Sequence, residues 1–228
     1  MQAEPDPQEP VGPARGGYPG PDQGLDQMKS VRGLLAHGGV WKHEMREKGS
    51  RPPRPRSQPA IIPVVSSWFE TYGYASILDE LVIGAYPLDA ADVGQLQGLG
   101  IQRVLNLVQE REYRAGEREA VEAAYAAAGI EEHRLDFTDF GDLPAKGIDI
   151  AVAQILGWLT EDWRTYLHCR AGWQRSAAVA AGVVAVRENL EIEDALAFVQ
   201  ARKPTADPLP HQVSDLRRWW HARRRPDA

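Results

Sequence analysis

The sequence contains a single cysteine, Cys169, among its 228 residues, so the chain cannot form an internal disulfide. It also lacks a run of the roughly 20 apolar residues that a membrane-spanning helix requires. Residues 1–24 are polar and rich in proline, without the apolar segment of a signal peptide. These absences favour a soluble, cytoplasmic protein. The net charge of −6 argues against general binding to nucleic acids.

Proline and glycine are concentrated at the start of the chain. We therefore interpret residues 1–60 as a disordered tail that ends in the proline- and arginine-rich stretch 51–59. A short amphipathic helix over 28–48 is the alternative for part of this tail. The folded domain is expected over 61–228. With 43% hydrophobic residues, the chain can form a sizeable core.

Short apolar runs alternate with helical patterns within 61–228. Four runs predict buried strands: ELVIGAYP (80–87), RVLNLV (103–108), EHRLDF (132–137) and TYLHC (165–169). Apolar residues at helical spacing predict helices around 121–128, 148–159, 176–186 and 192–199. This alternation is typical of an α/β domain, here with a mostly parallel sheet of four or five strands flanked by helices.

Cys169 follows the fourth predicted strand, and a short loop then leads to a helix that starts near Arg175 and Ser176. Ligands of parallel sheets bind beyond the carboxyl ends of the strands, and a helix N-terminus offers unpaired N–H groups to anions. Gly172 allows the loop to curl its amides around such an anion. Helix N-termini and nearby arginines favour the thiolate, so we expect Cys169 to be a nucleophile. The planar guanidinium of Arg175 can hold two phosphate oxygens.

The stretch HCRAGWQRS (168–176) resembles the His-Cys-x5-Arg-Ser/Thr signature of the cysteine-dependent protein tyrosine phosphatases. Its surroundings resemble the compact dual-specificity branch, because 77–110 and EDALAFVQARKP (193–204) are similar to that branch's opening segment and penultimate helix. The segment 68–87 is also similar to the mitochondrial type that dephosphorylates phosphatidylglycerophosphate. The resemblance covers about 77–220. It implies a phosphomonoester hydrolase with a phosphocysteine intermediate and no cofactor or metal.

The resemblance also implies which residues form the phosphate site. Cys169 would attack phosphorus, and Arg175 would bind the phosphate oxygens. The remaining phosphate-binding positions are those of the loop itself: Arg170, Ala171, Gly172, Trp173 and Gln174.

A leaving oxygen needs a proton, so the reaction requires a positioned acid. The resemblance implies an aspartate about 30 residues before the cysteine. Asp139 matches this spacing best, with Asp136 and Asp142 as alternatives. His168 is expected to orient the loop by hydrogen bonding, with an ordinary core histidine as the alternative. Ser176 is expected to hydrogen-bond the sulfur and ease its departure, with a helix-capping serine as the alternative.

Besides Arg175, the loop contains one basic residue, Arg170, which argues against a highly phosphorylated head group. We expect phosphotyrosine or phosphoserine/threonine in proteins as substrate, with a phosphatidylglycerophosphate-like or phosphoinositide lipid as the alternative. A binding module without turnover and a rhodanese-like sulfur transferase are further alternatives. The basic segment RRWWHARRRP (217–226) could contact an anionic membrane surface, or Leu216, Trp219 or Trp220 could pack a last helix onto the core.

Overall fold

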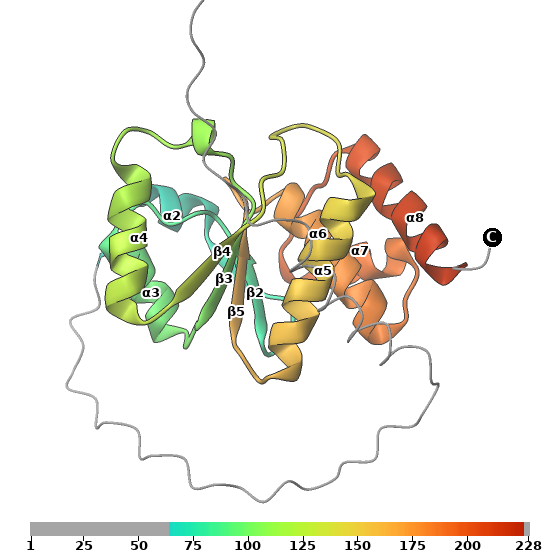
Figure 1. Ribbon diagram of the computed structural model, residues 1–228, viewed down its shortest axis with the longest axis horizontal. Helices are drawn as coiled ribbons and strands as arrows, with labels where there is room; N and C mark the ends of the chain where they lie inside the picture. The colour runs from blue at the N-terminus through green and yellow to red at the C-terminus, as the bar shows by residue number, and fades with distance from the viewer. Residues whose placement is uncertain (1–63, 226–228) are drawn as a thin grey trace, which may run out of the picture. The chain divides into compact units, whose positions relative to one another are not determined.

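The structure is a computed structural model that describes residues 64–225 (Figure 1). The predicted tail over 1–60 lies outside these residues. A five-stranded sheet with the order β1-β2-β5-β3-β4 forms the centre of the domain. β1 is antiparallel to β2, and the other neighbours are parallel, as the sequence predicted. The strands are β1 (Tyr74–Ser76), β2 (Leu81–Gly84), β3 (Arg103–Asn106), β4 (Glu131–Arg134) and β5 (Thr165–His168).

Helices cover both faces of the sheet (Figure 1). On one face lie α2 (Ser67–Tyr72), α3 (Ala90–Gly98) and α4 (Glu117–Ala128). On the other lie α5 (Ala145–Thr160), α6 (Arg175–Glu188), α7 (Ile192–Arg202) and α8 (Pro210–Arg224). A 3-10 turn, η1 (Glu110–Glu112), follows β3.

Alternate residues of the central strands point into two separate hydrophobic clusters. Val104 and Tyr166 pack into the cluster beneath α3 and α4. Their neighbours Leu105 and Leu167 pack into the cluster beneath α5 and α6. Successive side chains of a strand point to opposite faces, so a strand that is covered on both sides must be apolar throughout. This explains the continuous apolar runs from which β2, β3 and β5 were predicted.

α6 is the central helix of its layer. Residues 175–185 are all buried, and the helix packs against α5, α7 and α8. A helix buried on every side shows no polar face, which is why its sequence is apolar all round. This burial fixes the start of α6 against the sheet and thereby the loop that precedes it.

The structure differs from the sequence prediction at the edges of the sheet. The run EHRLDF was predicted as a strand over 132–137, but β4 spans Glu131–Arg134. β4 is an edge strand with polar, partly exposed residues, so its own apolar signal is weak. The apolar Leu135 and Phe137 lie after it, where their N–H groups still donate to the β3 side of the sheet. The short strand β1 was not predicted.

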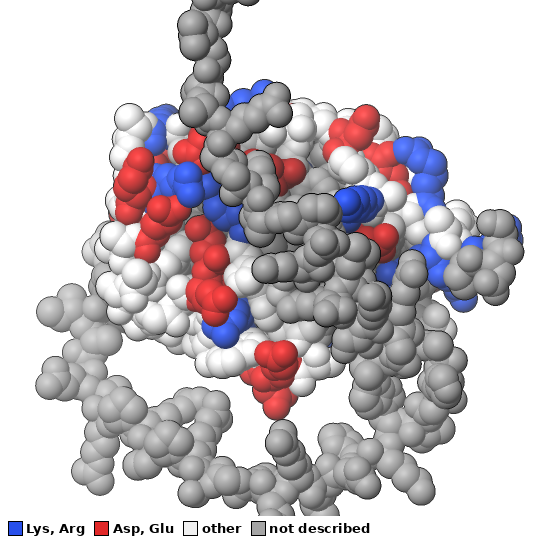
Figure 2. Space-filling view, viewed as in Figure 1, with Lys and Arg blue, Asp and Glu red and all other residues white. Residues whose placement is uncertain are grey.

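Charged side chains of both signs are interleaved over α4 and β4 on the face shown in Figure 2. Arg118 pairs with Glu110 at 2.6 Å and with Glu122 at 2.7 Å, and Arg103 pairs with Glu131 at 3.1 Å. The basic groups of this region are thus matched by neighbouring carboxylates. Among the helices of residues 64–225, none is both long and apolar enough to cross a bilayer.

Candidate active site

β5 carries Cys169 to the carboxyl edge of the sheet. All four residues of β5 are buried, and α6 begins at Arg175, as predicted. The sulfur of Cys169 lies 3.3 Å from the hydroxyl oxygen of Ser176. Only 3% of Cys169 is exposed. The thiol therefore lies at the base of a strand–loop–helix junction, with a hydroxyl group beside it.

The loop 170–174 is packed closely against β2. Gly172 has a φ of 75°, and a Cβ at this position would lie 2.6 Å from the carbonyl oxygen of Gly84. Only glycine satisfies both the conformation and the space. Within residues 64–225, no backbone N–H group of 170–174 donates a hydrogen bond to the protein. These amides are available for the oxyanion that the sequence predicted at this position.

Arg175 is buried at the first position of α6, with 1% of its side chain exposed. Its Nη1 and Nη2 each donate to one oxygen of Glu112 at 2.7 Å, and Nη1 also donates to the carbonyl of Phe137 at 2.9 Å. Burial lowers the pKa of Arg175. The hydrogen bond to Glu112 and the charges of Cys169, Glu112 and Asp139 outweigh burial and raise the pKa above its ordinary value. The guanidinium is therefore a permanent positive charge at this site.

The three candidate proton donors lie in different surroundings. Asp139 forms an ion pair with Arg175, with 2.9 Å between Oδ1 and Nη2. Asp136 lies 4.0 Å from Arg134. Asp142 is exposed, and its side chain accepts no hydrogen bond within the part of the chain that the structure describes. Of the three, Asp139 is the one that the structure pairs with the predicted phosphate-binding arginine.

His168 lies directly behind the loop and is 1% exposed. Its Nδ1 is 3.3 Å from the carbonyl oxygen of Cys169, which can only accept, so Nδ1 carries the proton in this hydrogen bond. Burial lowers the pKa of His168 to about 3, assisted by the positive charges of Arg175 and Arg134. The ring is therefore neutral at ordinary pH. Its orienting role, with an ordinary core histidine as the alternative, stays a prediction.

Comparison with known proteins assigns this geometry to a family. The family model described as "Dual specificity phosphatase, catalytic domain" matches residues 82–222. The chain belongs to the dual specificity phosphatase family. It is therefore a cysteine-dependent phosphatase, as the signature at 168–176 predicted.

Solved structures share the fold of this phosphatase. PTPMT1 in complex with PI(5)P has 22% sequence identity and a TM-score of 0.60, over 68% of this chain and 99% of that chain. The human tyrosine phosphatase-like serine/threonine/tyrosine-interacting protein has 22% identity and a TM-score of 0.55, over 66% and 97% of the two chains. A single-residue variant of human DUSP28 has 18% identity and a TM-score of 0.54, over 68% and 98%. At these identities the likeness is one of fold.

The site contains one further charged residue, Glu112, which was not predicted from the sequence. Its side chain is 7% exposed and holds Arg175. Its backbone carbonyl accepts a hydrogen bond from Arg170 Nη1 at 2.6 Å, and its Oε1 accepts one from the Gln109 N–H at 2.8 Å. One residue therefore anchors both arginines of the loop. One sequence signal could have indicated Glu112. A charged run, 110–112, follows the buried strand β3 at the carboxyl end of the sheet, where Cys169 also lies.

Aromatic side chains flank the loop on its α2 side. The guanidinium of Arg170 lies 5.3 Å from the ring of Trp68 and 5.5 Å from the ring of Tyr86. The ring of Trp173 lies 5.2 Å from that of Tyr72, and 39% of Trp173 remains exposed. We call these four aromatic residues the aromatic wall. Trp173 thus packs against a neighbouring segment and still presents part of its ring to solvent.

A buried lysine supports the same side of the loop. Lys203 is 5% exposed, and its Nζ donates to the carbonyl oxygen of Tyr72 at 3.1 Å. Burial lowers the pKa of Lys203, opposed by the charge of Cys169. Four residues later, the N–H of Asp207 donates to the carbonyl of Trp173 at 2.8 Å. The segment after α7 therefore holds both the loop and the aromatic wall.

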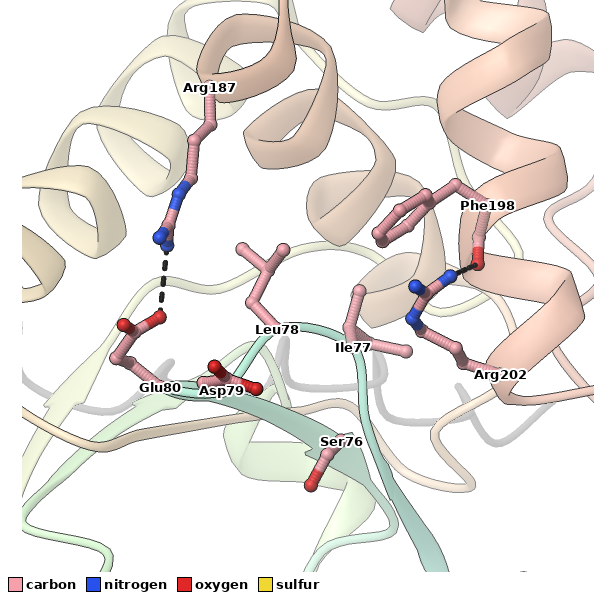
Figure 3. Close-up of a pocket in the computed structure, with 8 residues that line it drawn as sticks. All are labelled: Ser76, Ile77, Leu78, Asp79, Glu80, Arg187, Phe198 and Arg202. Carbon is pink, nitrogen blue, oxygen red and sulfur yellow. Dashed lines mark hydrogen bonds and ion pairs between the residues drawn. The ribbon is translucent and has the colours of Figure 1, made fainter.

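The phosphatase has a cavity of about 260 Å³ at the other end of the strands from Cys169, beside the amino end of β2 (Figure 3). It is lined by residues 76–80, which precede β2, and by Arg187, Phe198 and Arg202. Arg187 pairs with Glu80 at 3.0 Å, and Arg202 packs over the ring of Phe198 (Figure 3). No predicted site residue lines it. In the described range, no group of three or more His, Cys, Asp or Glu side chains is placed to hold a metal ion.

The C-terminal helix α8 packs onto the core through its aromatic residues. Trp219 and Trp220 are 3% and 5% exposed. Four arginines of α8 pair with carboxylates: Arg217 with Glu193, Arg218 with Asp215, Arg223 with Asp149, and Arg224 with Glu191. The interpretation of this segment as a packed last helix is confirmed, and contact with a membrane stays a prediction.

Proposed function

We propose that this phosphatase hydrolyses phosphomonoesters through a phosphocysteine on Cys169, and that its substrates are phosphorylated proteins. One observation supports the mechanism: Cys169, Arg175 and Asp139 lie together at the loop 170–174, whose backbone N–H groups donate no hydrogen bond within residues 64–225. A nucleophile, an oxyanion site and an acid are thus available at one place, as phosphoryl transfer requires.

The reaction has two steps. The Cys169 thiolate attacks phosphorus, a sulfur–phosphorus bond forms, the ester oxygen–phosphorus bond breaks, and Asp139 gives its proton to the leaving oxygen. Water then attacks the phosphocysteine while Asp139 takes the proton of that water, and the sulfur leaves as thiolate beside the hydroxyl of Ser176. Arg175 and the loop amides stabilise the equatorial oxygens in both steps.

The surroundings of Arg170 support a substrate with one phosphate group. The guanidinium donates to the carbonyl of Glu112 and lies over the rings of Trp68 and Tyr86. It is therefore engaged by the protein rather than available for a second phosphate. The partly exposed ring of Trp173 can pack against the ring of a phosphotyrosine, since offset aromatic pairs are favourable.

A phospholipid substrate is the second candidate. It is supported by the similarity of 68–87 to the phosphatidylglycerophosphate-hydrolysing type and by the shared fold with PTPMT1, which was solved with PI(5)P. A phosphorylated glycerol head group and a phosphopeptide both present one phosphomonoester group, and Cys169 and Arg175 act on that group alone. Residues outside the phosphate site therefore determine whether the enzyme prefers a phospholipid or a phosphopeptide.

A direct comparison of turnover tests the substrate class. The full chain should hydrolyse p-nitrophenyl phosphate without added metal and with inhibition by vanadate. Phosphotyrosine and phosphoserine/threonine peptides should have a higher kcat/KM than phosphatidylglycerophosphate in mixed micelles. A lipid kcat/KM above that of every peptide would contradict the protein substrate and favour the lipid.

The variant Cys169→Ser tests the mechanism against binding without turnover and against sulfur transfer. It should lose hydrolysis and still bind substrate, because the phosphate ligands remain. A wild-type protein that binds phosphopeptide without hydrolysing any ester would favour the binding module. Transfer of sulfur from thiosulfate to cyanide would favour rhodanese chemistry.

The pH dependence gives a further test. The first step needs an ionised thiol and a protonated carboxyl group, so kcat/KM should follow a bell-shaped curve. In Asp139→Asn the limb on the alkaline side should flatten, because this limb reflects loss of the acid. The same change in Asp136→Asn instead would assign the proton donor to Asp136.

A further inference from the structure

The guanidinium of Arg175 has two edges, and the protein uses them differently. Nη1 and Nη2 form one edge, which donates two aligned hydrogen bonds to Glu112, while Nη1 also reaches the carbonyls of Phe137 and Leu107. Nε and Nη2 form the other edge. Oδ1 of Asp139 lies 2.9 Å from Nη2 as an ion pair without an aligned hydrogen bond, and Nε is buried without a hydrogen-bond partner in the described part of the chain.

The second edge is the one that remains for a phosphate. Two parallel N–H groups of an arginine match two oxygens of a phosphate or a carboxylate. Glu112 already fills the first edge in this way, and the N–H of Gln109 holds its carboxylate from the other side. An incoming phosphate can therefore use Nε and Nη2, which means that it meets Asp139 at Nη2.

The exposed fractions of the side chains indicate which partner of Arg175 can be displaced. The side chains of Arg175 and Glu112 are 1% and 7% exposed, whereas that of Asp139 is 28% exposed. Asp139 accepts no hydrogen bond within the described residues and is held by its ion pair alone. The residue after it, Phe140, is 66% exposed and has a φ of 55°, which is unfavourable for a phenylalanine. The backbone around Asp139 is anchored, since Gly141 N–H donates to the Thr138 carbonyl and Gln212 donates to the Gly141 carbonyl. The side chain of Asp139 is thus the weakly held, partly exposed cover of a buried cation.

We propose that Asp139 occupies, in the ligand-free phosphatase, the place on Arg175 that one phosphate oxygen takes, and that substrate binding displaces it toward the leaving oxygen. This inference rests on the proposed function, since it assumes that Arg175 binds phosphate and that Asp139 is the acid. A phosphate gains two hydrogen bonds, one from Nε and one from Nη2, whereas the Asp139 carboxylate makes only an ion pair with Nη2. The exchange therefore places the carboxyl group at the ester bond only when a phosphate fills the loop. The carboxylate released from Arg175 takes a proton from solvent beside the anionic phosphate and then gives it to the leaving oxygen.

An acid that must leave Arg175 affects anion binding differently from an acid at a fixed position. Binding of any oxyanion must break the ion pair between Asp139 and Arg175, so removing the carboxylate should tighten the binding of an anion that has no leaving group. A partly exposed ion pair is worth enough to change affinity about fivefold. The catalytic acid would thus weaken product binding while it accelerates the chemical step.

Inorganic phosphate is the probe, titrated calorimetrically into the full chain at fixed pH and ionic strength. Three proteins are compared: Cys169→Ser, Cys169→Ser with Asp139→Asn, and Cys169→Ser with Asp136→Asn. We expect Asp139→Asn to tighten phosphate binding about fivefold. Asp136→Asn removes a charge from the same segment without touching Arg175 and should change the affinity less than about twofold. Equal tightening in both variants, or none in Asp139→Asn, would overturn the exchange.

A second measurement does not depend on phosphate affinity. Phenylglyoxal modifies accessible arginines, and peptide mass mapping reports the rate at Arg175. Because Asp139 is the exposed cover, Asp139→Asn should be modified faster at Arg175 than the wild type, and Asp136→Asn should not. Equal rates in all three proteins would show that Asp139 does not cover Arg175.

The failure of this inference and that of the proposed function give different results. If the wild type hydrolyses p-nitrophenyl phosphate while Asp139→Asn leaves phosphate affinity unchanged, the exchange is wrong and the phosphatase mechanism stands. If the wild type hydrolyses no phosphomonoester, both the proposed function and the proposed exchange of Asp139 for phosphate are wrong.

Discussion

Replacing His168 by asparagine should reduce the acid sensitivity of the fold. Asparagine cannot titrate, and its amide can donate to the Cys169 carbonyl in place of Nδ1. In the wild type, burial lowers the pKa of His168 from 6.5 to about 3, and the charges of Arg175 and Arg134 act in the same direction. Between these two values the unfolded chain binds a proton that the folded protein excludes.

The sign and size of the effect follow from this linkage. Above pH 6.5 neither state binds the proton, and the full contribution of the neutral ring to stability is present. As the pH falls from 6.5 toward 3, the free energy of unfolding decreases by about 1.4 kcal/mol per pH unit. Between pH 7.5 and 5.0 the loss due to His168 is therefore about 2 kcal/mol.

Urea denaturation at pH 7.5 and pH 5.0 measures this difference. The free energy of unfolding should fall by about 2 kcal/mol more in the wild type than in His168→Asn, because the contributions of all other groups are common to both. The exposed His221 provides the matched control, and His221→Asn should behave as the wild type. Equal pH dependence in the wild type and His168→Asn would refute the reasoning.

Three further substitutions test the loop. Gly172→Ala should abolish most activity and lower Tm, because its Cβ would overlap the backbone of Gly84; full activity with an unchanged melting curve would contradict this packing. Glu112→Gln should keep the fold but lower kcat roughly 10²-fold, since Arg175 loses its charged anchor; an unchanged kcat would show that the carbonyls suffice. Ser176→Ala should slow breakdown of the phosphocysteine and produce a burst of p-nitrophenol in rapid mixing; an unaltered steady-state rate without a burst would exclude this assistance.

The local parts of the site could be predicted because one short stretch contains them. Cys169, Gly172 and Arg175 lie within seven residues, and the buried strand and buried helix on either side fix how that stretch bends. The spacing to Asp139 came from the family resemblance, and the structure pairs this residue with Arg175.

The parts that escaped prediction depend on contacts between distant residues. Glu112 is 63 positions from Arg175 in the sequence, and nothing in the periodicity of either segment shows that they meet. The 3-10 turn that presents it is too short to leave a pattern. β4 escaped correct placement for another reason: an exposed edge strand needs few apolar residues, so the signal came from the buried residues after it.

The position of α2 has a consequence for how far the catalytic unit extends. The family match begins at residue 82, yet α2 supplies the ring of Trp68 over Arg170 and the carbonyl of Tyr72 to the ammonium group of Lys203. A chain shortened to the matched region would leave that ammonium group without its oxygen and would remove Trp68 and Tyr72 from the aromatic wall. We therefore expect a fully active fragment of this enzyme to include α2, ahead of its recognisable domain.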